Sequence, residues 1–218
     1  TGDQNTAAVC AYNGGTLENL TVAGSIGAKD FAAGIFAASL PMKEEDETLS
    51  KLVNHAKVTA DGTAAGIVAQ TKEKVLLEDC VNTGVIEAAV AAGITTAECE
   101  NLVLMRCQNY APIISSDNES YGITSNLTAN LTDCVGVSEN VYPIAADANE
   151  SENCLYFISG GEKLEDALLA DICDISLTIG ETDANGSYRE YPFVETSEEQ
   201  LQNLIKHQSV DVPVFPSS

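Results

Sequence analysis

Positive charge is scarce in this sequence. Only 10 of its 218 residues are Lys or Arg, against 33 Asp or Glu, and the formal net charge is −23 at pH 7. A chain with this balance repels nucleic-acid phosphates and anionic lipid headgroups. We therefore predict no nucleic-acid partner and no simple membrane-surface role. Cationic partners, metal ions or solubility alone remain open as reasons for the charge.

Long apolar runs are also missing. No segment approaches the roughly 18 apolar residues that a membrane-spanning helix needs, so we predict no transmembrane segment in this chain. The chain opens TGDQNTAAVC, without an initiator Met and without the basic and apolar regions of a signal peptide. We expect it to be a mature or excised piece of a protein that contains further domains.

Short catalytic and metal-binding motifs are absent. Only two histidines occur, His55 and His207, and neither belongs to H-E-x-x-H. No G-x-S-x-G, Walker or G-x-G-x-x-G motif is present, so we predict no catalytic residues, no cofactor and no enzyme activity. The seven cysteines form no C-x-x-C pair and no zinc-ribbon spacing, which argues against a metal site. They are Cys10, Cys80, Cys99, Cys107, Cys134, Cys154 and Cys173.

The sequence does contain an internal repeat. A column of aliphatic residues that follow small residues recurs every 21 to 32 positions, and a column of Leu-x-[Asn/Asp]-x units stays in phase with it. A period of this size indicates stacked repeats. The aliphatic column is Val9, Ile35, Ile67, Ile94, Ile123 and Ile144. The leucine column is Leu17, Leu52, Leu77, Leu104, Leu131 and Ser151, followed three residues later by Leu20, His55, Cys80, Cys107, Cys134 and Cys154.

Each repeat is made of short strand-like runs. GIVAQ, VLLEDCV and NLTVAG are β-branched or apolar and are broken by Gly, Asn and Asp rather than by helix caps. If the units wind as coils of a parallel β-helix, equivalent residues stack about 4.8 Å apart and form inward ladders. Parallel connections are overwhelmingly right-handed. We predict an all-β solenoid over residues 1–159, a right-handed parallel β-helix of about six coils.

One stretch favours a different structure locally. IEAAVAAGITTAECENLVLM, residues 86–105, is rich in good helix formers, and propensity alone predicts α-helix for part of it. Its Gly93-Ile94 pair nevertheless falls in register with Gly66-Ile67 and Gly122-Ile123. This register favours a strand-forming coil over a helix.

The Leu-x-[Asn/Asp]-x unit predicts a corner. Its first and fourth residues cannot both face inward on one straight strand, so a bend lies between them. Asn and Asp at the third place tolerate left-handed backbone conformations. Arg106 breaks this rule, but between Asp79 and Asp133 it would neutralise both carboxylates, for about 1 kcal/mol per pair at most. The third place holds Asn19, Asn54, Asp79, Arg106, Asp133 and Asn153.

These residues carry a family resemblance. AAGIVAQTKEKVLLEDCVNTG and YGITSNLTANLTDCVGV resemble the GLUG motif, a Gly-Leu-Gly type repeat of secreted and surface bacterial proteins, over roughly residues 7 to 159. The middle residue of the family's G-L-G is Ile here. The resemblance implies an extracellular or cell-surface location.

The pattern changes after Gly160-Gly161. EKLEDALLADIC predicts a short helix, DISLTIG and REYPFVE predict strands around an Asn-Gly turn, and TSEEQLQNLIKH predicts an N-capped helix. A solenoid end exposes unpaired strands. We predict that residues 160–218 form a small α+β cap followed by a terminal linker.

Candidate functional side chains have simpler structural explanations beside the functional ones. The Cys80, Cys107, Cys134 and Cys154 ladder is interpreted as buried inert thiols, with one disulfide or a reactive thiol as the alternative. A polar insertion, SSDNES at 115–120, is expected to project from a coil. The candidate binding surface is Tyr110, Tyr121, Tyr142, Asp79, Arg106 and Asp133, although packing and turn chemistry explain these residues without a ligand.

The sequence favours a non-catalytic module of a larger bacterial surface protein, acting in adhesion or display. Its partner would be a host or matrix protein or a glycan. The alternative is a carbohydrate-active β-helix enzyme, which would require an acidic groove with two outward carboxylates roughly 5 to 9.5 Å apart.

Overall fold

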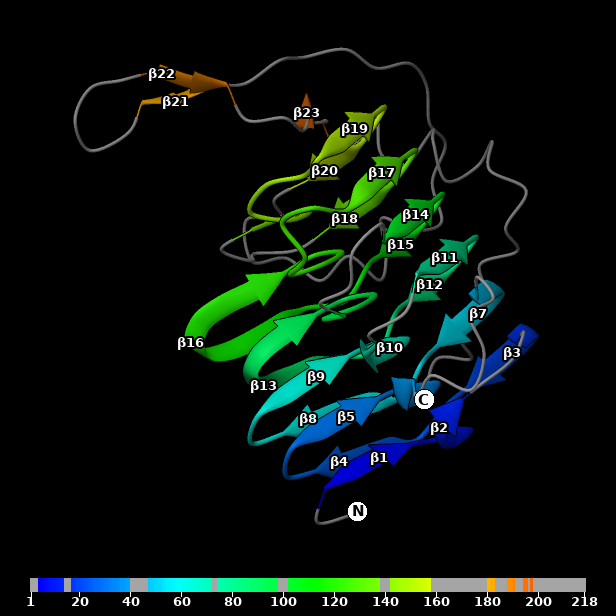
Figure 1. The fold of residues 1–218 in the computed structure, drawn as a ribbon. Helices are drawn as coiled ribbons and strands as arrows, with labels where there is room; N and C mark the ends of the chain where they lie inside the picture. The colour runs from blue at the N-terminus through cyan, green and yellow to red at the C-terminus, as the bar shows by residue number, and fades with distance from the viewer. Residues whose placement is uncertain are drawn as a thin grey trace.

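All regular structure in the described part of the chain is β-strand (Figure 1). The computed structural model describes residues 4–13, 17–39, 47–71, 74–97, 102–137, 142–157, 180–182, 188–190, 194–195 and 197. The helix that propensity alone favours within residues 86–105 is not formed, because β13 (Ile86–Ala92) and β14 (Val103–Met105) occupy both ends of that stretch. Among the described residues, no helix is long and apolar enough to cross a membrane.

Apart from one antiparallel pair near the C-terminus, described below, the strands form three parallel sheets. The first sheet contains β1 (Asn5–Ala7), β4 (Ser25–Ala28), β5 (Phe31–Ala33), β8 (Lys57–Ala60), β9 (Thr63–Ala65), β13 and β16 (Ile113–Tyr121). Strand β13 pairs with β8 through its first half and with β9 through its second half. Two short strands of the earlier coils therefore continue as one long strand in the later coils.

The second sheet is short. It consists of β2 (Cys10–Asn13), β6 (Phe36–Ser39) and β10 (Val68–Gln70), and its ladder continues beyond β10 through isolated bridges from Val68 to Thr95 and from Thr95 to Thr124.

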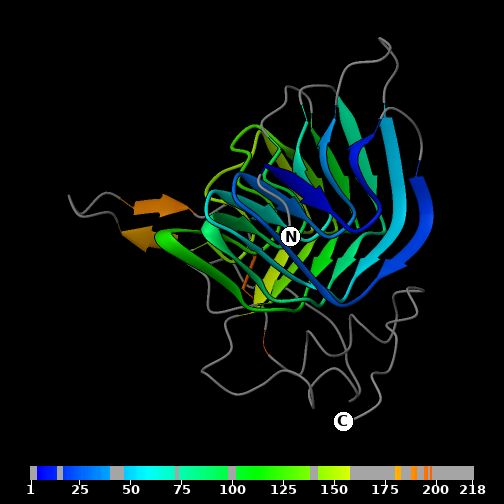
Figure 2. The ribbon, with the colours of Figure 1, turned by 90° about the horizontal axis from the view of Figure 1, so that it is seen from below.

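The third sheet is the largest. Its strands are β3 (Leu17–Val22), β7 (Glu47–Asn54), β11 (Val75–Glu78), β12 (Val81–Asn82), β14, β15 (Gln108–Asn109), β17 (Asn130–Thr132), β18 (Val135–Val137), β19 (Glu150–Glu152), β20 (Leu155–Phe157) and β23 (Val194–Glu195). Each passage of the chain, which we call a coil, crosses the sheets in turn. The three sheets curl around a shared interior (Figure 2), an arrangement compatible with a β-solenoid.

The aliphatic column is stacked as predicted. Backbone N–H groups donate from each member to the carbonyl of the next, at 3.2, 3.2, 3.0, 3.0 and 2.8 Å from Val9 through Ile35, Ile67, Ile94 and Ile123 to Ile144. All five isoleucines are fully buried, whereas Val9 at the first coil is 43% exposed. Matching residues of successive coils therefore lie over one another and share backbone hydrogen bonds.

The leucine column is correct except in one coil. Leu49, not Leu52, pairs with Leu17 and Leu77, and Leu52 pairs with Leu20. The predicted placement of Leu52 and His55 is wrong by three residues, because Leu52-Val53-Asn54 fits the Leu-x-[Asn/Asp] pattern whereas the unit that forms the corner, Leu49-Ser50-Lys51, has a lysine at the third place.

The predicted corner is confirmed by backbone conformation. Six equivalent residues have φ between 52° and 56°, the left-handed region that Asn and Asp tolerate best. The second coil places Lys51 there instead of Asn54, as the register correction requires. The six are Asn19, Lys51, Asp79, Arg106, Asp133 and Asn153.

The misassigned Asn54 belongs to a buried ladder instead. The Asn54 Nδ2 donates to Asn82 Oδ1 at 2.8 Å, and Asn82 Nδ2 donates to Asn109 Oδ1 at 2.7 Å. Each amide also bonds to the backbone two residues later, and all three side chains are fully buried. The amides therefore satisfy one another inside the stack, as buried polar groups must.

Glycines pack directly against these amides. A Cβ added to Gly34, Gly66 or Gly93 would overlap both the carbonyl oxygen of the next glycine in the column and the side chain of Asn54, Asn82 or Asn109, respectively. Backbone approaches backbone too closely there for any side chain.

The predicted C-terminal cap is described only in part. Strands β21 (Gly180–Thr182) and β22 (Tyr188–Glu190) form an antiparallel pair across the segment that contains the predicted Asn-Gly turn. The two predicted helices, at 162–173 and 196–207, lie outside the described residues apart from the single residue Ser197.

Candidate functional site

An open groove of about 790 Å³ follows the stack beside the first sheet. One wall consists of Phe31 on β5, Thr63 on β9, Val90 on β13, and Glu119 and Tyr121 on β16. Strand register joins Phe31, Thr63, Val90 and Glu119 into one row across successive coils. The alternate residues Ala32, Ala64 and Ala91 face the core, so this row faces outward.

The other wall comes from the chain that follows each of these strands. It contains Ala69, Gln70 and Thr71, then Thr96 one coil later, and residues 125–128 in the next coil. Two side chains hold this wall in place: Thr96 Oγ1 donates to the Ala69 carbonyl at 2.5 Å, and Asn126 Nδ2 donates to the Ala97 carbonyl at 3.0 Å. These two hydrogen bonds join successive coils along this wall.

An aromatic pair replaces a row of alanines beside the groove. Ala33, Ala65 and Ala92 stack in register, and the next coil has Tyr121 at the same position. The Tyr121 ring stacks on Tyr142, with centroids 5.1 Å apart and planes 10° apart. The two tyrosines belong to adjacent coils, joined by a backbone bridge, so their stacked rings continue the row of Ala33, Ala65 and Ala92.

The lining is mostly uncharged and polar. Seven of the lining residues are Ser, Thr, Asn or Gln, Tyr121 adds a phenol hydroxyl, and Glu119 is the one carboxylate among the described lining residues. Leu127, at the rim, is 55% exposed. This mixture suits a ligand that makes hydrogen bonds and apolar contacts together.

The predicted polar insertion positions Glu119. Between Ala88 and Val90 the partner strand β16 inserts extra residues, and Asn118 has a φ of 61°. Ser115 Oγ accepts hydrogen bonds from the backbone N–H groups of Asp117 at 3.1 Å and Glu119 at 2.9 Å. The insertion is a hydrogen-bonded bulge that brings a carboxylate to the groove.

The structure brings two of the three predicted tyrosines together. Tyr121, which is 8% exposed, lines the groove, and the partly exposed Tyr142 stacks on it. Tyr110 is 5% exposed, and its hydroxyl donates to Gln108 Oε1. Burial raises the pKa of Tyr110. Its inclusion in an exposed binding surface is wrong, because its ring and hydroxyl are used for packing.

The predicted charged residues lie on the third sheet, away from the groove lining. Arg106 Nε donates to Asp79 Oδ1 at 2.6 Å, and its Nη2 pairs with Glu78. Among the described residues, Arg106 forms ion pairs with Glu78 and Asp79 and none with Asp133. The predicted bridging of both aspartates is therefore wrong, because the guanidinium reaches back to one coil only. The hydrogen bond to Asp79 has the largest effect in raising the pKa of Arg106, and the hydrogen bond to Glu78 has the next largest.

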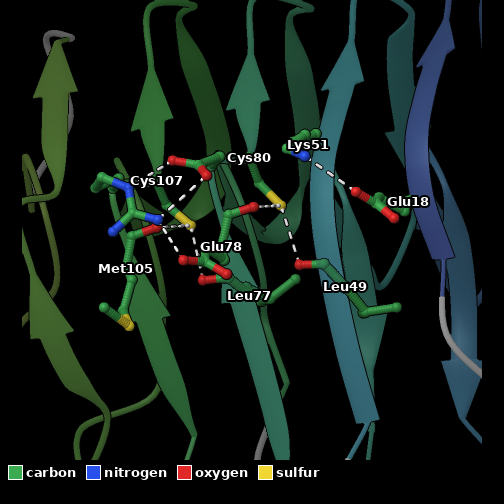
Figure 3. Close-up of polar contacts among 10 residues, drawn as sticks. Glu18, Leu49, Lys51, Leu77, Glu78, Cys80, Met105 and Cys107 are labelled. Carbon is green, nitrogen blue, oxygen red and sulfur yellow. Dashed lines mark hydrogen bonds and ion pairs between the residues drawn. The ribbon is translucent and has the colours of Figure 1, made fainter. Parts of the chain in front are cut away.

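Lys51 repeats this geometry in an earlier coil. Its Nζ lies 3.0 Å from Glu18 Oε1, where Glu18 precedes a corner residue just as Glu78 does (Figure 3). Each cation at a corner thus pairs with the coil before it. Exposed pairs of this kind contribute about 0 to 1 kcal/mol, and we interpret the corner as structural.

The cysteine ladder is buried and reduced. Cys80, Cys107, Cys134 and Cys154 are free and inaccessible, and the thiols of Cys80 and Cys107 donate to the Leu49 and Leu77 carbonyls at 3.8 and 3.4 Å (Figure 3). Burial raises the pKa of Cys107 and of Cys134 well above the ordinary value. A buried thiol with a raised pKa forms little thiolate, which is the reactive form of cysteine. The geometry therefore fits the interpretation of these thiols as inert.

We expect these four thiols to resist alkylation in the folded protein. Iodoacetamide at pH 8 should label Cys107 and Cys134 at least about a hundredfold more slowly than in urea-unfolded protein, since both burial and a raised pKa suppress the thiolate. Peptide mass spectrometry after timed labelling measures each site separately. Equal labelling rates of Cys107 in the folded and unfolded protein would contradict the buried ladder.

His55 gives a prediction on pH. Burial lowers the pKa of His55 below its ordinary value of 6.5, and its Nδ1 lies 2.5 Å from Thr83 Oγ1. The unfolded chain therefore binds a proton more readily than the folded chain, so the contribution of His55 to stability declines as pH falls through 6.5. Urea unfolding at pH 7.5 and 5.5 should show a larger loss of stability for the wild type than for His55→Gln. An equal loss in both proteins would exclude His55 as a source of acid sensitivity.

The groove residues other than Tyr121 were not recognised from the sequence. A signal was present, because Phe31, Thr63, Val90 and Glu119 each lie three residues before the glycine of their coil. Their side chains have no common chemistry, however, and only the stacked geometry shows that they share one wall.

Comparison with models of protein families, with curated proteins and with solved structures finds no match to this chain. Within the described residues, no group of three or more His, Cys, Asp or Glu side chains is placed to hold a metal ion.

Proposed function

We propose that this chain is a non-catalytic binding module of a larger bacterial surface protein, and that the groove is its binding site. The observation that carries the proposal is the groove itself, about 790 Å³ in volume and lined by mostly neutral side chains. Its size lies in the range of known ligand sites, roughly 300 to 1,000 Å³. Adhesion to a host or matrix protein or to a glycan, or display on the cell surface, would use such a site.

The finer architecture belongs to the same proposal. We propose a right-handed parallel β-helix of about six coils over residues 1–159, built of GLUG-like repeats, with an α+β cap at 160–218. The stacked isoleucine column and the repeated corner support a coil-by-coil construction. The motif resemblance supports an extracellular or cell-surface location.

Binding is favoured over catalysis by the charge of the groove. Acid–base cleavage of a glycosidic bond uses two carboxyl groups on opposite sides of that bond. The described groove lining contributes one, Glu119. Asp79, Asp133 and Arg106 belong to corners of the third sheet and are absent from that lining.

The test compares binding by the purified chain on glycan and matrix-protein arrays with binding by Leu127→Ala. The matched control is Ile114→Ala, because Ile114 is 49% exposed on β16 but does not line the groove. Binding that Leu127→Ala weakens and Ile114→Ala preserves is the expected result. Array binding that both variants preserve would rule out the groove as the site.

A polysaccharide-depolymerisation screen tests the enzyme alternative. We expect no turnover of any polysaccharide by the wild type. Reproducible turnover that Glu119→Gln abolishes would replace the binding module with a carbohydrate-active enzyme.

A further inference from the structure

We infer that the groove binds an uncharged, hydroxyl-rich chain, a neutral linear polysaccharide, that lies along the stack axis. The inference rests on the proposed function, since it names the ligand class of the same groove. Charge, hydrogen-bonding groups, backbone pairing and the shape of the walls each contribute to it.

Charge excludes acidic ligands. The described lining has no cationic side chain, and its one ionisable carboxylate is Glu119. Lys29, two residues before Phe31, is exposed but does not line the groove, and Lys57 pairs with Glu87 at 2.8 Å. With a net charge of −23 on the whole chain, a polyanion would be repelled at long range and would meet no compensating cation in the groove.

The hydrogen-bonding groups match hydroxyls. The hydroxyls of Thr63 and Ser125 and the amide of Gln70 can each donate and accept, whereas Thr96, Asn126 and Thr128 already form hydrogen bonds within the wall. Sugar hydroxyls also donate and accept, so they are complementary to these three side chains. A charged side chain acts only as a hydrogen-bond donor or only as an acceptor. The described lining contains one such side chain, Glu119.

Backbone pairing argues against an extended peptide. A peptide that binds by adding a strand requires the open edge of a sheet. Here β9 and β13 pair with neighbours on both sides, so the groove presents their outward side chains and not their backbone edges. The N–H and C=O groups of a peptide lying along the stack could form hydrogen bonds mainly with side chains and not with the backbone of a strand.

Apolar side chains supply the remaining contacts. Phe31, Val90 and Leu127 lie at intervals along the groove, and the largely buried Tyr121 also lines it. Sugar rings present C–H surfaces that pack on aromatic and aliphatic groups, while their hydroxyls point to the polar wall. The wall from β5 to β16 spans three strand spacings, about 14 Å, which is long enough for several sugar units.

The experiment is isothermal titration calorimetry of the full chain with defined hexasaccharides. The neutral probes are cellohexaose, mannohexaose and xylohexaose, and the acidic probe is hexagalacturonic acid. We expect at least one neutral probe to bind and the acidic probe not to bind. Leu127→Ala should weaken neutral binding about tenfold through lost apolar contact. Ile114→Ala, outside the groove lining, should leave it within about twofold.

The outcomes separate this inference from the proposed function. Binding of hexagalacturonic acid as tight as that of any neutral probe, or groove-dependent binding of a matrix protein without any oligosaccharide, would overturn the neutral-glycan inference and leave the groove as a binding site. Neutral binding that Leu127→Ala does not change would overturn the placement of the glycan. If Leu127→Ala weakens the binding of no ligand, both the inference and the proposed function fail.

Discussion

Replacing Gly66 by alanine should lower the free energy of unfolding by at least about 3 kcal/mol. The new Cβ would overlap the Gly93 carbonyl oxygen and the Asn82 side chain. Neither neighbour can withdraw easily, because Gly66 N–H donates to the Ala92 carbonyl at 3.2 Å and Asn82 is held on both sides by other amides. Urea unfolding of the purified variant, followed by circular dichroism, measures the loss.

Gly24→Ala is the matched control for this variant. Gly24 has a φ of 113°, and a Cβ there would have no atom within 4 Å. Its substitution adds backbone strain alone, about 1 to 2 kcal/mol. A Gly66→Ala protein as stable as Gly24→Ala would show that the coils can move apart at no cost, against the close stacking described above.

Asn82→Leu should cost about 4 kcal/mol of stability. Asn82 Nδ2 donates to the Gly84 carbonyl at 2.9 Å and to Asn109 Oδ1 at 2.7 Å, and its Oδ1 accepts from Gly84 N–H at 3.3 Å and from Asn54 Nδ2 at 2.8 Å. All four hydrogen bonds are buried. A leucine of similar volume would remove them and leave the partner groups with neither a protein group nor water to bond to.

The control for the asparagine variant is Asn130→Leu. Asn130 Oδ1 accepts from Asn149 Nδ2 at 2.7 Å in an exposed position. Water can replace that bond, so the loss should stay under about 0.5 kcal/mol. Similar losses from both leucine variants would mean that the buried amide ladder contributes no more than a surface contact.

The two ladders depend on one another. Asn54, Asn82 and Asn109 fit because Gly34, Gly66 and Gly93 leave room for them. The next position after Asn109 in the ladder is Gly136, which pairs with it in register. The amide ladder therefore ends inside the stack, where a glycine replaces the next asparagine.

The repeat and its stacking could be predicted from the sequence because each coil carries its own copy of the pattern. Ile67, Ile94 and Ile123 each follow a glycine, so the three copies agree in sequence around the isoleucine as well as at it. This agreement predicts the observed stacking despite the helix propensity of residues 86–105. The corner followed from Leu-x-[Asn/Asp]-x by geometry alone. Positive φ at Asp79 and Asp133 agrees with it.

The register of the second coil could not be settled in this way. Leu49 and Leu52 each begin a plausible unit, and Asn54 matches the corner as a residue type. What selects the observed register is the burial of Asn54 against Asn82, a contact between residues 28 positions apart. A local pattern carries no information about such a pair.

The groove depended wholly on tertiary structure. The sequence by itself determined that like residues stack, that the chain turns at the corner residues and that the cysteines and isoleucines form inward ladders. The tertiary structure decided which unlike residues share the outer wall, that Tyr121 stacks on Tyr142 while Tyr110 is buried, and that Arg106 reaches Asp79 and Glu78. The physical reason is that an inward ladder selects one kind of side chain in every coil, whereas an outward surface leaves each coil free to differ.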